Sequence, residues 1–274
     1  MAKENVNELV DKLTLFDDDL MSRVFDNNIE ATELMLRIIM GRNINVISVI
    51  GQDEIKSHEV GGRNITLDVH AIDVNGDEID IEVQGNSAGA HIRRARYHSS
   101  MVDSKMLDEG QEFRQLKDSY IIFIYKHDKF RKGLPVYHID RYIRETEELF
   151  DDGSHIIYVN GNYKGNDEIG QLMNDFRQTD SDKIHYAALA KGVKHFKDTE
   201  KGREQMCEAV EKYAKEYAKE YAKEYAKEYA VKEKMISVKN LMENMELTVD
   251  QALNALGIQG DERKTIINQL QNRN

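Results

Sequence analysis

Two strand-like runs govern the architecture, Leu67-Asp68-Val69-His70-Ala71 and Ile79-Asp80-Ile81-Glu82-Val83-Gln84, and they flank the turn dipeptide Asn75-Gly76. Both runs are typical of the arms of a β-hairpin. A two-residue Asn-Gly turn would place the apolar residues of the two arms on opposite faces, whereas a three-residue loop over 74–76, with Gly76 left-handed as a bulge, restores agreement. The sequence therefore predicts that Asp73 pairs with Asp77. The apolar residues that then share one face are Leu67, Val69, Ala71, Ile79, Ile81 and Val83.

The same register places Asp68 directly opposite Glu82. Opposed strand side chains have Cβ atoms roughly 4.5–5.5 Å apart, and like charges there are destabilising, so a positive group is expected between them. A hard divalent cation fits, because Mg²⁺ in proteins binds one or two carboxylates and keeps water and phosphate ligands. Gln84 points the same way as Glu82, since strand side chains alternate. A solvated acidic face is the alternative that this spacing leaves open.

The composition limits the kinds of protein that this chain could be. The chain has 274 residues, of which 40% are hydrophobic, which suffices for one good core and an appendage. It has no apolar run long enough to span a bilayer, and its start, MAKENVN, lacks the apolar stretch of a signal peptide. We therefore expect a soluble, cytoplasmic protein with no membrane partner. The single cysteine, Cys207, excludes an internal disulfide and a cysteine cluster for zinc.

The net charge of −12 argues against adhesion to nucleic acid over the whole surface, because neutralising phosphates requires clustered Lys and Arg. Basic residues are nevertheless concentrated at 93–96 and 126–132, and much of the acid lies elsewhere, at 17–19, 145–148 and 151–152. An acidic metal site with a basic rim is compatible with this distribution.

The remaining periodicity predicts the element order α-β-β-β-α-β. A helix is expected over 17–40 with Gly41 at its end, then a short strand over 45–50, the hairpin, and a helix over 88–107. The apolar run 119–125 suits a buried central strand. Strand-like runs at 136–139 and 155–159 are expected to extend or cap the sheet, and helical patterns return near 167 and from 182 onward.

The C-terminal part contains a repeat of the tetrapeptide Tyr-Ala-Lys-Glu over 213–230. All its residue types except Tyr are strong helix formers, so a stable exposed helix is expected. The period of four turns successive tyrosines by about 40°, which disfavours a heptad coiled coil. We expect a spacer or a self-association arm, through which the chain could form a homo-oligomer.

The tail is predicted to be a small helical module. Thr248 is expected to cap a helix that Gly257 closes. We divide the chain into a domain over 1–200, a long exposed helix over 201–234 and the helical tail over 235–274. The apolar residues expected to form a small core or a dimer contact in the tail are Leu253, Leu256, Ile258, Ile266 and Ile267.

Four motifs follow one another along the chain: Leu15-Phe16-Asp17-Asp18-Asp19-Leu20-Met21-Ser22-Arg23-Val24-Phe25, Leu67-Asp68-Val69-His70-Ala71, Asp80-Ile81-Glu82-Val83-Gln84 and Arg93-Arg94-Ala95-Arg96-Tyr97-His98-Ser99. Together they resemble the PD-(D/E)XK nuclease superfamily, and most closely its transposase-associated, recombination-promoting (Rpn) branch, over about residues 13–200. The resemblance implies a restriction-endonuclease-like α/β fold, with an α-β-β-β-α-β core and a mixed central sheet flanked by helices. A long C-terminal helix and a small helical tail would follow it.

The resemblance also implies a metal site. In that superfamily the matching residues hold Mg²⁺ (or Mn²⁺), and here they are Asp68, Glu82 and the backbone carbonyl of Val83. The third motif position is usually Lys, whereas this chain has Gln84, a replacement that the Rpn-like branch shares. Glutamine cannot act as a base, so it could only orient the attacking water, and deprotonation would rest on the metal.

Further site residues are suggested beside the metal ligands. Asp18 matches a recurring aspartate of the branch and Glu33 is chosen on helical position, as candidates for an additional acid; Asp18 could instead cap a helix N-terminus. Basic residues early in the helix after the metal strand are expected to hold the scissile phosphate or its neighbours, unless they form a solvated, salt-bridging face. These phosphate-binding candidates are Arg93, Arg94, Arg96 and Tyr97.

The sequence therefore predicts a Mg²⁺-dependent endodeoxyribonuclease associated with transposition or recombination. It would hydrolyse phosphodiesters with a Mg²⁺-activated water and contact mainly the phosphates of DNA. The alternative is a catalytically degenerate nuclease fold that serves as a DNA-binding or self-associating scaffold, which Gln84 and the acidic surface support.

Overall fold

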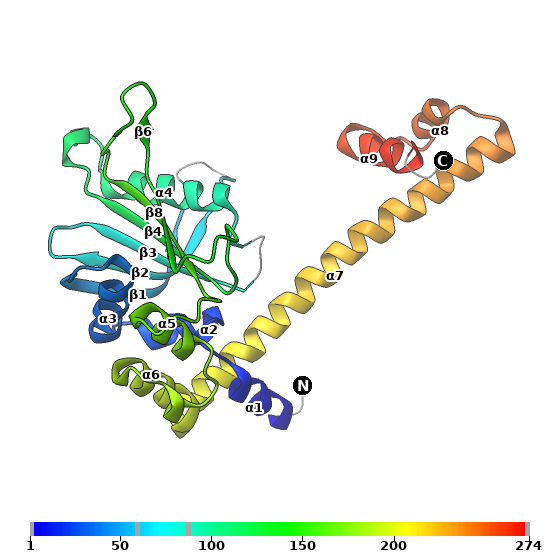
Figure 1. The fold of residues 1–274 in the computed structure, drawn as a ribbon. Helices are drawn as coiled ribbons and strands as arrows, with labels where there is room; N and C mark the ends of the chain where they lie inside the picture. Colours follow the sequence, from blue (N-terminus) through cyan, green and yellow to red (C-terminus); the bar gives the residue numbers. More distant parts are fainter. Residues whose placement is uncertain (1–2, 58–60, 86–88, 272–274) are drawn as a thin grey trace. The chain divides into compact units, whose positions relative to one another are not determined.

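The computed structural model describes residues 3–57, 61–85 and 89–271. The chain forms two compact units, Met1–Val210 and Glu211–Asn274, and the helix α7 (Glu200–Met245) contributes to both. The first unit contains the sheet, and the second is helical (Figure 1). No helix among the described residues is both long and apolar enough to cross a membrane.

A mixed sheet of six strands forms the centre of the first unit, in the order β1-β2-β3-β4-β8-β5. The first three strands pair antiparallel, β3, β4 and β8 pair parallel, and β5 runs antiparallel to β8. The predicted mixed α/β architecture is therefore confirmed. The strands are β1 Val46–Ile55, β2 Ile65–Asp73, β3 Glu78–Gln84, β4 Ser119–Tyr125, β5 Val136–Ile139 and β8 Ser154–Asn160, and a separate pair is β6 Tyr142–Ile143 with β7 Glu148–Leu149.

Helices cover both faces of this sheet (Figure 1). The central strand β4 is buried along its whole length because its sequence is apolar on both faces. Ile121 and Phe123 pack in the core beneath α4 (Ile92–Met106), and Ile122 and Ile124 belong to the core of the opposite face. The helices that contribute to that second core are α1 Lys3–Lys12, α2 Asp18–Phe25, α3 Ile29–Met40, α5 Glu168–Phe176, α6 Ala187–Asp198 and the start of α7.

The N-terminal helix differs from the expected single helix over 17–40. It is broken into α2 and α3, because Asn27 has a left-handed φ of 53° and the Asn28 side chain accepts the Ala31 N–H as a new N-cap. Gly41 ends α3 in the left-handed conformation, as predicted. The strand expected over 45–50 continues to Ile55. Of the helix expected over 88–107, α4 supplies 92–106, and Ala88 lies outside the described residues.

The hairpin β2–β3 has the predicted register. The Asp73 N–H donates to the Asp77 carbonyl, Gly76 has a φ of 83°, and Val69 lies opposite Ile81. One prediction was wrong: Leu67 packs in the core beneath α4, whereas Val69 packs in the opposite core. The alternation of β2 breaks between them because Gln52, which lies between the β1 partners of Val69 and Leu67, has a φ of 56°.

The glycine before this irregularity lies very close to α2. A Cβ at Gly51 would be 2.5 Å from the Ser22 carbonyl oxygen, so Gly51→Ala is expected to destabilise the protein by about 1–3 kcal/mol through overpacking. Gly85→Ala is the matched control, because no atom lies within 4 Å of its Cβ position. Urea unfolding of both variants measures the difference, and equal stabilities would contradict the close packing of β1 on α2.

The second unit is closed by a small core between the end of α7, α8 (Val249–Ala255) and α9 (Gly260–Gln271). The predicted cap is confirmed, because the Thr248 hydroxyl accepts the Gln251 N–H. Gly257 follows α8 with a φ of 65°. Leu253, Ile258 and Ile266 are buried in this core, whereas Leu256, at the C-cap of α8, is exposed, so for Leu256 the alternative of a dimer contact stays a prediction. Two short 3₁₀ helices complete the chain, Phe113–Gln115 and Ser181–Lys183.

Candidate metal centre

Asp68 and Glu82 meet where β2 separates from β3. The described ladder between these strands ends at the pair Val69 and Ile81. Beyond it, the Asp68 N–H donates to Glu82 Oε1 at 3.1 Å and the Val83 N–H donates to Asp68 Oδ2 at 2.9 Å. Each carboxylate therefore binds the backbone of the other strand in place of a strand carbonyl. Asp68 is 7% exposed and Glu82 is fully buried.

The Val83 carbonyl belongs to the same side of β3 as Asp68. The N–H and C=O of one strand residue point to the same neighbouring strand, and the Val83 N–H is bonded to Asp68. The next residue points the other way, because the Gln84 carbonyl accepts the N–H of Lys126 after β4. The local backbone thus directs the Val83 carbonyl toward the paired carboxylates.

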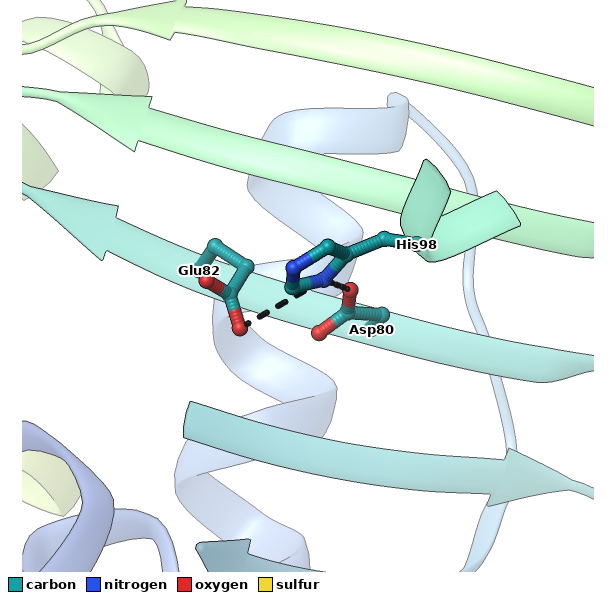
Figure 2. Close-up of side chains that lie close together, drawn as sticks. All are labelled: Asp80, Glu82 and His98. Carbon is teal, nitrogen blue, oxygen red and sulfur yellow. Dashed lines mark hydrogen bonds and ion pairs between the residues drawn. The ribbon is translucent and has the colours of Figure 1, made fainter. Parts of the chain in front are cut away.

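A third buried carboxylate lies beside them. Asp80 and Glu82 are two positions apart on one face of β3, and His98 of α4 points toward both (Figure 2). His98 Nδ1 is 2.8 Å from Asp80 Oδ2 and 3.9 Å from Glu82 Oε1. Asp80 Oδ1 is buried and has no hydrogen-bond partner within the described part of the chain. The cluster therefore contains a carboxylate oxygen that is able to bind a cation or a proton.

The positive group beside Glu82 is the guanidinium of Arg94. Its Nη2 is 2.6 Å from Glu82 Oε2, and its Nε donates to His98 Nε2 at 3.2 Å. Because arginine only donates, His98 Nε2 must accept, so the neutral imidazole carries its proton on Nδ1 and donates it to Asp80. His98 is thereby a link between Asp80 and Arg94, and its Nδ1 is not free to bind a metal in this arrangement.

Negative charge outweighs positive charge in this cluster. Burial, followed by the charge of Glu82, raises the pKa of Asp68 well above its ordinary value. Burial, followed by the charge of Asp68, does the same to the pKa of Asp80. Burial and the charge of Asp80 raise the pKa of Glu82 to about 8 despite Arg94 and His98. Burial lowers the pKa of His98, which keeps the imidazole neutral.

An open pocket reaches Asp68, Arg94 and His98 of this cluster, whereas Asp80 and Glu82 are fully buried and do not line it. It brings together most of the residues expected at the site, and the Tyr97 hydroxyl donates to the Arg63 carbonyl at its rim at 2.7 Å. Asp18 lines this pocket, whereas the N-cap position of α2 belongs to Asp17. The expected site residues that line the pocket are Asp18, Asp68, Gln84, Arg93, Arg94 and Tyr97.

Two of the predicted site residues, Glu33 and Arg96, lie outside this pocket. The Glu33 carboxylate accepts the Val46 N–H at 2.9 Å and lines a different pocket beside α3. Arg96 is exposed on α4 and does not line the pocket. Asp80 and His98 were not among the site residues predicted from the sequence. Their signals were the two-residue spacing of Asp80 from Glu82 and the four-residue spacing of His98 from Arg94, which place each pair on one face.

The comparison with known families agrees with this architecture. The profile of the family described as PD-(D/E)XK nuclease family transposase matches residues 26–240. The chain belongs to this family. Neither the curated proteins nor the solved structures that were searched returned a match. Membership confirms the resemblance indicated by the sequence motifs and supports a nuclease-like, transposase-associated role.

The donors of the site fit the divalent cation that nucleases of this type generally use. Three carboxylates are buried here, of which Glu82 is paired with the Arg94 guanidinium, and Asp80 Oδ1 lacks a partner among the described residues. Carboxylate and carbonyl oxygens are the ligands that Mg²⁺ and Mn²⁺ accept in proteins. Asp68 reaches the pocket. The residues present therefore suit a hard cation that enters from the pocket side.

Proposed function

We propose that this protein is a metal-dependent DNA endonuclease that acts in transposition or recombination. The observation that supports this most directly is the pair of buried carboxylates, Asp68 and Glu82, each bonded to the backbone of the other's strand. Such a pair is costly to bury without a compensating cation. Asp68 of this pair lines a pocket that also contains Arg63, Arg93 and Arg94, an arrangement that suits phosphodiester hydrolysis.

Asp68, Glu82 and the Val83 carbonyl would hold the cation, Mg²⁺ or Mn²⁺. When bound there, it supplies the Lewis acidity that makes water nucleophilic at neutral pH and offsets the charge of the phosphate. Gln84 lines the pocket, and its amide is able to orient the attacking water by hydrogen bonds but not to deprotonate it. Asp18 lies in the same pocket as an additional acid for a second water or cation.

The DNA backbone would be held by basic groups around the pocket. Arg93 and Tyr97 lie on its α4 side, and the basic loop 126–132 begins next to Gln84, since the Lys126 N–H donates to the Gln84 carbonyl. The Asp128 carboxylate accepts the N–H groups of Phe130 and Arg131 in this loop and of Gly133 just after it, and so fixes the shape of the loop. Contacts of this kind bind phosphates and read no bases, so we expect weak sequence specificity.

The double variant Lys129→Ala/Lys132→Ala is expected to weaken DNA binding to a similar extent for unrelated sequences. Each phosphate contact contributes about 0.9 to the slope of log K against log salt, so the slope should fall by about 2. Fluorescence anisotropy from low to high salt measures it. Lys191→Ala/Lys201→Ala removes two exposed lysines of α6 and α7 and should leave the slope unchanged. Equal slopes in both double variants would remove the loop from the DNA-binding surface.

Cleavage of single-stranded, duplex and branched DNA with Mg²⁺, with Mn²⁺ and with EDTA tests the activity itself. We expect cleavage with either cation and none with EDTA. The alternative function, a DNA-binding or self-associating scaffold, draws support from Gln84 and from the Arg94–Glu82 ion pair. A scaffold would bind DNA with no cleavage and no stoichiometric cation site that depends on Asp68. The cytoplasmic location and the self-association through the repeat helix remain predictions.

A further inference from the structure

We propose that Arg94 is an exchangeable cation: it holds Glu82 when no metal is present, and metal binding transfers it to a DNA phosphate. The inference rests on the proposed nuclease function and adds to it a coupling between the two ligands. Arg94 would be neither a fixed support of Glu82 nor a permanent phosphate ligand.

The contacts of Arg94 place it in competition with a cation. Its Nη2 binds Glu82 Oε2 at 2.6 Å, and the other Glu82 oxygen accepts the Asp68 N–H. A divalent ion held by Asp68 and Glu82 needs a lone pair of Glu82, and its positive charge would repel a guanidinium at that carboxylate. The Arg94 side chain is 37% exposed, whereas Glu82 is fully buried. Arg94 is therefore the partner that is able to move.

The pair Asp80 and His98 keeps Arg94 close to the site after such a displacement. His98 Nδ1 is tied to Asp80, and His98 Nε2 accepts the Arg94 Nε–H. This second anchor holds the base of the guanidinium while Nη1 and Nη2 can turn toward the pocket, which Arg94 lines. A planar fork so placed matches the oxygens of a phosphate. Asp80 and His98 are thus positioning residues for Arg94.

The exchange makes the two ligands cooperative. In the absence of DNA, a cation must first break the Arg94–Glu82 pair, which weakens its binding. When DNA is bound, a phosphate accepts the released guanidinium and offsets that cost. By linkage, the cation must then strengthen DNA binding by the same factor. The protein would bind each ligand weakly alone and both tightly together.

Calorimetric titration with Mn²⁺ in the absence of DNA tests the competition. Arg94→Gln, which removes the charge and keeps an amide donor only at about the position of Arg94 Nε, is expected to bind Mn²⁺ about ten-fold more tightly than the unmodified protein. Arg94→Ala should change in the same direction. Arg93→Ala is the matched control, since it removes the adjacent charge in the same pocket, and should change the affinity less than about two-fold.

Anisotropy with a short duplex, with and without Ca²⁺, tests the coupling. Ca²⁺ should tighten binding of the unmodified protein about ten-fold and that of Arg94→Gln less than about two-fold. If Arg94→Gln bound Mn²⁺ with equal or lower affinity, or Arg93→Ala showed the same gain, the exchange would be refuted while the metal site stood. If the unmodified protein bound no Mn²⁺, the metal-dependent function would fail, and the exchange with it.

Discussion

Asp68→Asn is expected to lower metal-dependent DNA cleavage by at least about 10³-fold without unfolding the protein, a loss of about 4 kcal/mol of transition-state stabilisation. The amide oxygen introduced by this substitution can still accept the Val83 N–H that Asp68 Oδ2 accepts now, so the local backbone arrangement should survive. What disappears is the negative charge that would hold the cation. Initial cleavage rates in Mg²⁺, together with Mn²⁺ calorimetry, measure the effect.

Stability should change in the opposite direction from activity. Burial raises the pKa of Asp68 well above its ordinary value, which means that the folded protein disfavours its charge when no metal is bound. Asp68→Asn should therefore unfold at the same or a higher urea concentration in EDTA. The control is Asp103→Asn, at a half-buried carboxyl of α4 whose pKa is also raised by burial and which accepts the Ser119 hydroxyl. Its cleavage rate should stay within about two-fold. Sustained nicking by Asp68→Asn would rule out Asp68 as a ligand.

The register of the hairpin was predictable because the alternation of side chains along each strand and the need for both arms to bury a common face lead to the same turn. The two-residue period fixes which side chains share a face, and only the bulged loop at Gly76 makes both arms bury theirs in one core. The reversal at Leu67 was not predictable in this way. It depends on the left-handed conformation of Gln52, which belongs to the neighbouring strand and carries no signal within β2 itself.

Site residues predicted from helical periodicity are likewise misplaced where the backbone departs from the expected element. Glu33 was chosen on its position in a helix expected to be continuous over 17–40, within which side chains keep a fixed phase of about 100° per residue. The break at Asn27 and Asn28 removes this phase relation, and Glu33 binds the Val46 N–H instead. The Asp-Asn-Asn sequence at 26–28 was the available signal, since asparagine favours caps and left-handed conformations over helix interiors.

The sequence alone does not show which charged residues pair with one another in the fold. Arg93, Arg94 and Tyr97 were predicted to lie together early in the helix after β3, and the structure brings all three to one pocket with Asp68, while their role in binding phosphate stays a prediction. The sequence could not show that Arg94 pairs with Glu82, because that contact depends on how α4 packs across the sheet. The role of Arg94 therefore follows from tertiary geometry.

The unfolding free energy of the metal-free protein is expected to fall as the pH rises from about 5 to 8, and Glu82→Gln should remove much of this dependence. The pKa of Glu82 is about 8 in the folded protein against an ordinary value of 4.5. Between these values the folded state keeps a proton that the unfolded state has lost. Stability then decreases with rising pH, at about 1.36 kcal/mol per pKa unit and with an upper bound of about 5 kcal/mol.

Urea unfolding in EDTA at several pH values from about 5 to 8 measures this dependence in the unmodified protein and in Glu82→Gln. The variant is uncharged at every pH and keeps one side-chain oxygen, which can accept the Asp68 N–H that Glu82 Oε1 accepts now, while the acceptor for Arg94 at Oε2 is lost. His70 also has a raised pKa, through its bonds to Glu78 and Asp53, and loses stabilising charge over the same range. It is present in both proteins, so the difference between their slopes reports Glu82 together with the effect of its charge on the pKa of Asp68. Saturating Mn²⁺ should flatten the slope of the unmodified protein alone, because a bound cation favours the ionised carboxylate that burial opposes. Identical slopes in the two proteins would show that Glu82 is already ionised in the fold, and the cation would then have no buried proton to displace there.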